Sequence, residues 1–419
     1  MTRARTAGAV PGAPTTQPRP SPSVAPGVVE VFAGVGSVAA GFVEVLGGDI
    51  ILLNDVDPLA KQAAKDNLGE DVLYDDGDVR ELTGERVVDA ADGRDVTALL
   101  GCPPCQGWSA AGLRQSNDAR NLLLGEFFRL VRELTPRFFV MENVAGVAGR
   151  SEFAGALASV NDRYSWWAGV LNSASYGLPQ TRQRTLALGY RRDLGVNPTA
   201  PKPTHGGARG VWDYRSESLM TPSAETLDAI LGSAPRVQPG RGSFHSMTAL
   251  YDDIHDLPNF VTVEDAIGDL DGNDPSEYSL ALRGAGPLPV PVPDDHVAWG
   301  HGPDLVRRLA LVREGRRPPK EATNGTVYYS QAYARLHRRG LARTVTTNFH
   351  NPGSGRFTHY RRDRTLTVRE AARLQGFPDS FRFPGTRSAQ ARLVGNAFPL
   401  LWAKRLAEHV RDELGDALH

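Results

Sequence analysis

Short apolar runs alternate with helical stretches between residue 28 and about residue 195, and this alternation constrains the fold most. Five runs are strongly apolar: VVEVFAG, DIILLND, VTALLGC, RFFVMEN and RTLALGY. Helical stretches such as PLAKQAAKDNL and LLGEFFRLVRELTP separate them. Continuous apolar runs are typical of strands buried on both faces, as in parallel sheets with crossover helices. The pattern predicts an α/β domain built on a mostly parallel sheet.

The rest of the chain divides by composition. Residues 1–27 are rich in Pro, Ala and Thr and show no apolar face, which predicts a disordered N-terminal arm. Residues 28–195 form the α/β domain. In 196–385 the period breaks into Pro- and Gly-rich loops such as ALRGAGPLPVPVPDDH, which indicates a second, irregular domain. Residues 386–419 end in the helical pattern LLWAKRLAEHVRDEL, which we expect to pack back on the first domain.

Charge and cysteine content limit the function classes. The net charge of the chain is −1, but residues 331–383 hold eleven Arg and only three acids, Asp363, Glu370 and Asp379. That excess suits a polyanionic partner. The sequence has no long apolar span and no apolar signal core, so neither a membrane nor export is indicated. Two cysteines make no disulfide framework, and a reducing cytoplasm fits best.

Three strand ends carry residues suited to an adenosine-type cofactor. The run VVEVFAGVGSVAAGF reads as a strand, a Gly turn and a helix, where backbone N–H groups can approach a ligand. Asp55 ends the next strand, where an acid would accept hydrogen bonds from ribose hydroxyls. Asp78 and Val79 stand where they would border an adenine ring. The glycine spacing departs from the dinucleotide fingerprint, which favours S-adenosylmethionine over NAD.

The pair Cys102 and Cys105 in GCPPCQGWS leaves several interpretations open. A zinc site would need two more ligands, but the chain has no second C-x-x-C and its histidines are scattered, so we expect no metal. A redox pair fits the spacing but leaves the strand ends unexplained. Two buried apolar cysteines are the default if the pair stood alone. A single nucleophile remains, and Cys105 is the better candidate because Cys102 still belongs to the strand end.

Two further stretches place charge at the same edge of the sheet. MENV carries Glu142 at the end of the apolar run RFFVMEN, either as a solvated cap or as a functional carboxylate. In QTRQR, Gln180, Arg182 and Arg184 alternate, so the two arginines face one side of a strand. They either belong to an exposed strand face or meet an anionic or carbonyl partner.

With these motifs in this order, followed by RTLTVREAARLQGFPD and GNAFP, the chain resembles the DNA (cytosine-5)-methyltransferases over residues 28–410. Small departures are Ser37, Trp108 and Phe398, which replace the usual Gly, Phe and Val. The resemblance implies a class I S-adenosylmethionine-dependent methyltransferase fold, Rossmann-like and α/β, with a smaller irregular target-recognition domain at 196–385.

The resemblance also implies the chemistry. C5 of cytosine is too weak a nucleophile to attack a methyl sulfonium until a thiolate has added at C6. Cys105 would supply that thiolate, and Glu142 would hold N3 and the exocyclic amine. Arg184, with Arg182 beside it, would stabilise charge on the O2 side of the ring. The implied cofactor contacts are Phe32, Gly34, Val35, Asp55, Val56, Asp78, Val79, Pro104, Leu123 and Asn396.

The same resemblance implies a duplex DNA substrate. The target base must be flipped out of the helix, and the loop after Cys105, which includes Arg114, would close over the DNA. The Arg-rich stretch would contact phosphates. A monomer that serves a restriction-modification system, with a possible cognate endonuclease, or acts as an unpaired methylase is expected.

Three rival functions differ in what they predict. A tRNA cytosine-5 methyltransferase would keep the chemistry, but that branch of the family has a much reduced recognition region, whereas this one spans roughly 150 residues. A silent DNA-binding protein on this fold would not need Cys105, Glu142 and Arg184 together. A thiol oxidoreductase would form a Cys102–Cys105 disulfide and bind no cofactor.

Overall fold

The computed structural model describes residues 25–104, 123–207, 209–221, 256–272, 275–284, 294–323 and 331–418, together with the backbone of Ser243–His245. Most of the predicted arm, the loop with Arg114 and the predicted nucleophile Cys105 lie outside these ranges. Within them, no helix combines the length and apolar character needed to cross a bilayer.

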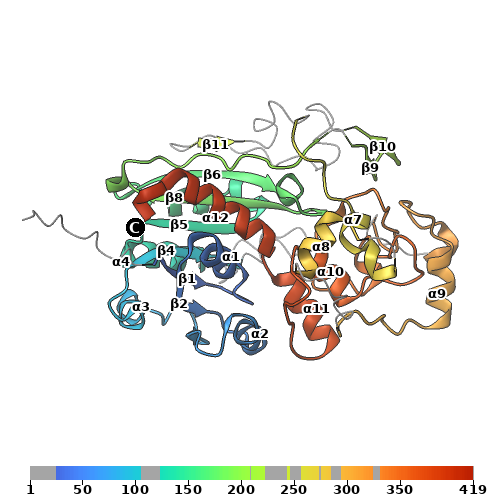
Figure 1. Ribbon diagram of the computed structural model, residues 1–419, viewed down its shortest axis with the longest axis horizontal. Coiled ribbons are helices and arrows are strands. Elements are labelled where there is room, and N and C mark those ends of the chain that lie inside the picture. Colours follow the sequence, from blue (N-terminus) through green and yellow to red (C-terminus); the bar gives the residue numbers. More distant parts are fainter. Residues whose placement is uncertain are drawn as a thin grey trace, which may run out of the picture.

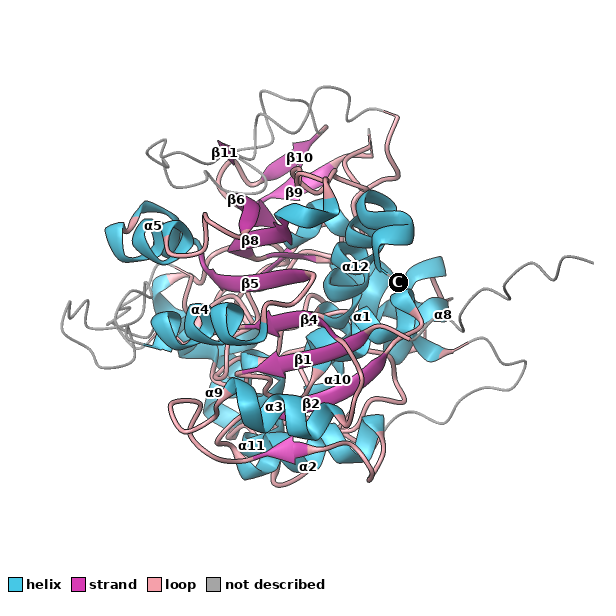
Figure 2. Cartoon of the chain, turned by 90° about the vertical axis from the view of Figure 1, so that its left-hand side faces the viewer, coloured by secondary structure: helices cyan, strands magenta, loops and turns pink. Residues whose placement is uncertain are grey.

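An eight-stranded sheet forms the centre of the first part of the chain (Figures 1 and 2). Its spatial order is β11-β6-β8-β5-β4-β1-β2-β3. The strands are β1 (Gly27–Val31), β2 (Asp49–Asn54), β3 (Tyr74–Asp75), β4 (Val96–Gly101), β5 (Phe138–Val144), β6 (Tyr164–Asn172), β8 (Gln183–Arg191) and β11 (Ser243–His245).

The prediction of a mostly parallel sheet is confirmed, with β8 as the one antiparallel strand among the eight. The strands β1 to β5 pair in parallel with their neighbours. The strand β8 instead runs antiparallel to both β5 and β6, and β6 was not predicted at all. A parallel connection needs a crossover of a dozen or more residues, and the link 173–182 between β6 and β8 is shorter than that. The strand β8 therefore runs antiparallel beside β6.

Helices cover both faces of the sheet (Figure 2). One face packs against α1 (Ser37–Leu46) and α12 (Leu400–Leu414), through side chains that include Phe42 and Trp402. The other face packs against α3 (Gly84–Ala91), α4 (Leu123–Leu134) and α5 (Ser151–Ala158). The prediction that the last helix packs back on the first domain is thus confirmed. The helix α2 (Pro58–Leu68) follows β2 at the edge of the sheet.

A second body of mostly irregular chain lies beside the sheet, on the right in Figure 1. Its core is a third apolar cluster that also includes Val35 and Ala60, which connects it to the first part of the chain. Its elements are β9 (Val211–Asp213), β10 (Ser218–Met220), α7 (Val263–Ile267), α8 (Glu277–Arg283), α9 (Pro303–Ala310), β12 (Ala342–Arg343), α10 (Val368–Leu374) and α11 (Arg387–Asn396). The short strand β12 pairs in parallel with β7 (Gln180–Thr181).

Four arginines of the Arg-rich stretch do not serve as expected. Arg335, Arg356, Arg369 and Arg373 are almost completely buried. Arg335, for example, donates to the carbonyls of residues 309, 312, 359 and 362 and pairs with Asp363. Irregular chain leaves many carbonyls without ladder partners, and a guanidinium can satisfy several at once. The prediction of phosphate contacts is therefore wrong for these four side chains.

Candidate active site

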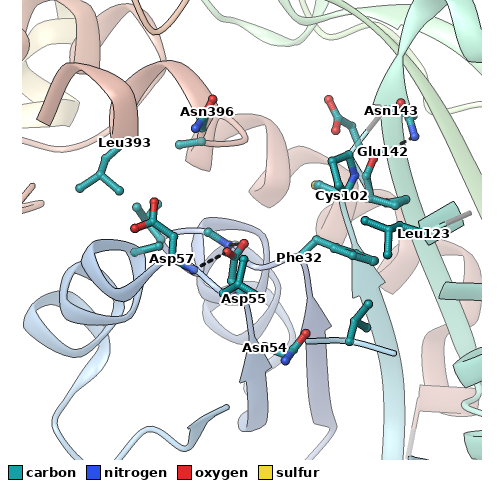
Figure 3. Close-up of a pocket in the computed structure, with 18 of the residues that line it drawn as sticks. Phe32, Asn54, Asp55, Asp57, Cys102, Leu123, Glu142, Asn143, Leu393 and Asn396 are labelled. Carbon is teal, nitrogen blue, oxygen red and sulfur yellow. Dashed lines mark hydrogen bonds between the residues drawn. The ribbon is translucent and has the colours of Figure 1, made fainter. Parts of the chain in front are cut away.

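A cavity of about 560 Å³ lies at the carboxyl ends of β1, β2, β4 and β5. The strand order reverses around β1, which places the cavity at the switch point where open α/β sheets bind ligands. Every predicted site residue that the structure describes lines it: Phe32, Gly34, Val35, Asp55, Val56, Asp78, Val79, Pro104, Leu123, Glu142, Arg182, Arg184 and Asn396. Figure 3 shows Asp55 and Phe32 on one side of the cavity, with Glu142 and Cys102 on the other.

Backbone in the left-handed region shapes the turn after β1. Phe32 has φ 55° and Gly34 has φ 51°, so this turn departs from extended geometry as soon as the strand ends. Apart from its neighbours Ala33 and Val35, no atom of the described residues lies within 4 Å of the position that a Cβ on Gly34 would take. Since Gly34 lines the cavity, its backbone faces open space directly, where a ligand could approach it closely.

Asp55 is held in place by two backbone donors. The N–H of Gly34 donates to Oδ2 at 2.9 Å, and the N–H of Asp57 donates to Oδ1 at 3.0 Å. Burial raises the pKa of the Asp55 carboxyl, and these two donors partly offset the increase. Each carboxylate oxygen retains a further acceptor position, so the side chain can still bind a hydroxyl in the cavity.

Apolar side chains stand next to Asp55. Val56 is 65% exposed although it is apolar, and it lines the cavity together with Phe32 and Val79. Exposed apolar surface in a concave site suits a flat hydrophobic ligand group. Asp78 is also at the rim, where the hydrogen bonds from Arg80 lower the pKa of its carboxyl to about 2.

Asp57 connects this wall to the C-terminal part of the chain. Its Oδ1 accepts the N–H of Leu59 and caps α2, and its carboxylate also pairs with Arg392 of α11. Leu393 and Asn396 on the same helix line the cavity (Figure 3). Chain segments more than 330 residues apart therefore share one wall.

On the opposite side, Glu142 and Arg184 come from adjacent antiparallel strands. Glu142 lies in β5 and Arg184 in β8, where Arg184 is opposite Val144. Arg184 Nε lies 2.6 Å from Glu142 Oε1, and the two side chains are 15% and 12% exposed. The pair lacks hydrogen-bond alignment, so this buried oxygen has no hydrogen-bond donor within the described chain. Its acceptor capacity is therefore unused within the described chain.

Arg182 is even more enclosed, at 4% exposure. Its Nη1 donates to Gln375 Oε1 at 3.4 Å, whereas its buried Nε has no hydrogen-bond partner in the described residues. Burial, and after it the charge of Arg184, lowers the pKa of Arg182 to about 9. A buried guanidinium with an unsatisfied N–H at a cavity wall is suited to a carbonyl or anionic partner.

Cys102 lies directly after β4 and faces Glu142. Burial, and then the negative charge of Glu142, raises the pKa of the Cys102 thiol well above its usual range. A thiol in that environment keeps its proton and is a poor nucleophile. Cys102 is therefore poorly suited to act as a nucleophile in this environment.

Asn143 is a site residue that the sequence reasoning missed. Its Nδ2 donates to the carbonyl of Pro103 at 3.1 Å, while its Oδ1 accepts the N–H of Val144 at 2.8 Å. It thereby fixes the chain that leads to Cys105 against the end of β5. Its position next to Glu142 in MENV was the available signal.

Other lining residues were also missed: Asn54, Asp57, Ala60, Pro103, Val144, Leu393, Gly395 and Ala397. Most are immediate neighbours of residues that were predicted. Leu393 carries no signal in the sequence, because only the packing of α11 brings it to the cavity. In the described part of the chain, His, Cys, Asp and Glu form no cluster of three or more that could hold a metal ion.

Comparison with known proteins agrees with this geometry. Residues 27–412 match the family model described as C-5 cytosine-specific DNA methylase. The Type II methyltransferase M.DdeI of Desulfomicrobium norvegicum is 28% identical, with 91% of this chain and 88% of the relative covered. M.XorII of Xanthomonas oryzae is 29% identical, with 92% and 84% covered.

Among solved structures, a putative DNA modification methyltransferase encoded within an E. coli prophage matches with a TM-score of 0.66. It is 22% identical and covers 93% of this chain and 99% of its own, which establishes the similarity of fold. A class I methyltransferase fold, a switch-point cavity and a family match over most of the chain lead to one conclusion. The chain belongs to the C-5 cytosine-specific DNA methylase family and is a DNA cytosine methyltransferase.

Proposed function

We propose that the protein transfers a methyl group from S-adenosylmethionine to C5 of a flipped-out cytosine in a specific duplex sequence. The observation that carries the proposal is the single cavity that joins the Asp55 wall to the Glu142–Arg184 wall. A methyl donor held at the first wall and a pyrimidine held at the second would meet within one enclosed space, which is the arrangement that methyl transfer requires.

The residues of the first wall fit the donor. Asp55 would accept hydrogen bonds from the ribose hydroxyls, and Val56 with Val79 would contact the adenine faces. The uncovered backbone at Gly34 leaves room for the amino-acid part. When bound, S-adenosylmethionine supplies an electrophilic methyl group on a sulfonium. Phe32, Asp78, Val35, Pro104, Leu123 and Asn396 would complete the enclosure.

The second wall would act on the base. The thiolate of Cys105 adds to C6, and the electron pair of the C5–C6 double bond then makes C5 nucleophilic. Glu142 would hold N3 and the exocyclic amine, while Arg184 and Arg182 would stabilise the developing charge on the O2 side. After transfer, loss of the C5 proton to water expels the thiolate and restores the double bond.

The substrate is proposed to be duplex DNA. The loop after Cys105 would occupy the space that the flipped base leaves, and residues 196–385 would read the sequence in the major groove. The relatives are named Type II methyltransferases. We therefore propose a role in restriction-modification, with the protein acting as a monomer in the cytoplasm.

Two experiments test the proposal. Bisulfite sequencing of DNA from a methylation-deficient bacterial host that expresses the protein should reveal cytosines methylated within one short sequence. A duplex with 5-fluorocytosine at that position should then form a covalent adduct that survives denaturation, because fluorine cannot leave C5 as a cation. If DNA stays unmodified and tRNA from the same cells gains 5-methylcytosine, the DNA assignment is wrong. An active enzyme that gives no adduct contradicts addition at C6.

A further inference from the structure

Gln375 is a completely buried side chain that the proposed chemistry has not used. It follows α10 within the motif RTLTVREAARLQGFPD. Burying an amide is costly unless its donors and acceptors are all paired. The environment of Gln375 provides partners for both ends of the amide, and these partners belong to the two opposite walls of the cavity.

The acceptor end contacts the base wall. Gln375 Oε1 accepts a hydrogen bond from Gln180 Nε2 at 3.1 Å and another from Arg182 Nη1 at 3.4 Å. Within the described chain, the contact to Gln375 is the only hydrogen bond that the Arg182 guanidinium makes. The orientation of that buried cation therefore depends on where Gln375 lies.

The donor end contacts the cofactor wall. Gln375 Nε2 donates to the carbonyl of Val394 and, at 3.5 Å, to the carbonyl of Ala397. These two carbonyls flank Gly395 and Asn396, which line the cavity. The helix α11 ends at Asn396, where the last carbonyls lack helical donors, so the amide serves as a side-chain cap.

The direction of this amide is fixed by groups that cannot exchange roles. The backbone N–H of Val345 must donate, and it donates to Gln180 Oε1 at 3.2 Å. Gln180 therefore directs its NH₂ group at Gln375, so the Gln375 amide must accept this hydrogen bond through its oxygen. Its own NH₂ then faces the two carbonyls of the α11 terminus. A flipped amide would place donors against donors and acceptors against acceptors.

The α11 terminus also has no room to move independently. A Cβ on Gly395 would stand 2.4 Å from the backbone nitrogen of Thr347, so the two backbones already touch. Any displacement of Gly395 and Asn396 must therefore carry the neighbouring chain and the cap of Gln375 with it.

From this geometry we infer that Gln375 is a positioning residue that couples the two walls: it holds Arg182 for the base and the α11 terminus for the cofactor. The inference rests on the proposed function, because it assigns S-adenosylmethionine to one wall and cytosine to the other. It adds a device by which both ligand sites depend on one side chain that touches neither ligand.

Two substitutions separate the two ends. Gln375→Glu keeps an oxygen for Gln180 and Arg182 but removes both donors to α11. Gln375→Met has a similar length and loses both ends. Gln390→Met is the control, because Gln390 lies on α11 and its side-chain amide donates to the carbonyl of Phe383, which does not line the cavity. Each variant is compared with wild type in two measurements. Calorimetry gives the Kd of S-adenosylhomocysteine, and methylation of unmethylated plasmid DNA gives kcat, which is normalised to the concentration of cofactor-binding sites.

The expected result is a split between the variants. Gln375→Glu should weaken S-adenosylhomocysteine binding by about 10-fold, the usual effect of unpairing buried groups, while kcat at saturating cofactor stays within about 3-fold of wild type. Gln375→Met should show the same loss of affinity and a kcat lower by about 10-fold. Gln390→Met should change neither value.

Other outcomes overturn the inference in distinguishable ways. Wild-type values in both Gln375 variants, or equal loss of kcat in both, would contradict the two-sided role. If Gln375→Met does not fold, Gln375→Glu still tests the inference. An unchanged Kd of S-adenosylhomocysteine or a tenfold lower kcat in Gln375→Glu would contradict the inference. A wild-type enzyme that binds no S-adenosylhomocysteine would instead refute the proposed function, and the inference with it.

Discussion

At the scale of single residues, the two cysteines should differ sharply in effect. Cys105→Ala should lower kcat by roughly three orders of magnitude or more, because the covalent step is lost. Cys102→Ala should retain most of the activity, since burial and Glu142 raise the pKa of its thiol and keep it protonated. Methyl transfer from labelled cofactor measures both. An inactive Cys102→Ala enzyme beside an active Cys105→Ala enzyme would reverse the assignment.

The ion pair across β5 and β8 should be needed for chemistry rather than for binding the cofactor. Glu142→Gln keeps the shape of the side chain but changes what it can donate and accept, so kcat should fall by about 10²- to 10⁴-fold. Arg184→Ala should lower kcat by about 10²- to 10³-fold. The Kd of S-adenosylhomocysteine, measured by calorimetry, should change little for either variant. Unchanged kcat values would mean that the target cytosine does not bind at Glu142 and Arg184.

At the scale of elements, Glu30 in β1 provides a pH test. Its carboxylate is 1% exposed and accepts the N–H of Ala39 at 2.7 Å, which joins β1 to the first turn of α1. Burial raises the pKa of Glu30 to about 8, with the charge of Asp55 adding to the increase. Between the unfolded value of 4.5 and about 8 the folded state binds the extra proton, so stability must fall as pH rises through that window.

Glu30→Gln should remove that contribution. The difference in unfolding free energy between the variant and wild type should grow in favour of the variant by up to about 1.4 kcal/mol per pH unit between pH 5 and 8. Urea unfolding at several pH values measures it. Asp55, whose pKa is also raised, stays in both proteins, so only the part of its titration that depends on the charge of Glu30 enters the comparison. A pH-independent difference would mean that Glu30 is ionised throughout.

The sequence predicts elements where their signal is local. The apolar runs locate β1, β2, β4, β5 and β8, and the capping pattern of Thr367 with Glu370 marks the start of α10. The direction of β8 depends on the short return from β6, a strand that went unrecognised. The burial of Arg335 and Arg356 depends on carbonyls supplied by segments about 20 to 40 residues away in the sequence, at the end of α9 and in the chain that follows it. Such pairings carry no periodic signal, and the same reason hides the role of Gln375.

At the scale of the whole molecule, the apolar core on one face of the central sheet is discontinuous in the sequence, because the end of the chain completes it. Trp402 of α12 is fully buried and stacks on Tyr176 and Phe398, with ring centroids 5.8 and 5.2 Å away. Phe398 belongs to the motif GNAFP, two residues after Asn396 in the cavity wall. The segment that closes the cofactor wall is therefore anchored by the same helix that completes the core.

Trp402→Ala should destabilise the protein by about 3–5 kcal/mol, through the cavity that it leaves between α12 and the sheet. Trp402→Phe keeps a ring and removes an indole N–H that is buried without a hydrogen-bond partner in the described chain, so its cost should be clearly smaller. Arg411→Ala on the exposed side of α12 is the control. Chemical denaturation gives the free energy of unfolding of each of the three variants. For Trp402→Ala, the fraction of protein that binds S-adenosylhomocysteine should fall together with the folded fraction. A fragment that ends before residue 400 and still folds and binds this ligand would contradict the dependence of the first domain on α12.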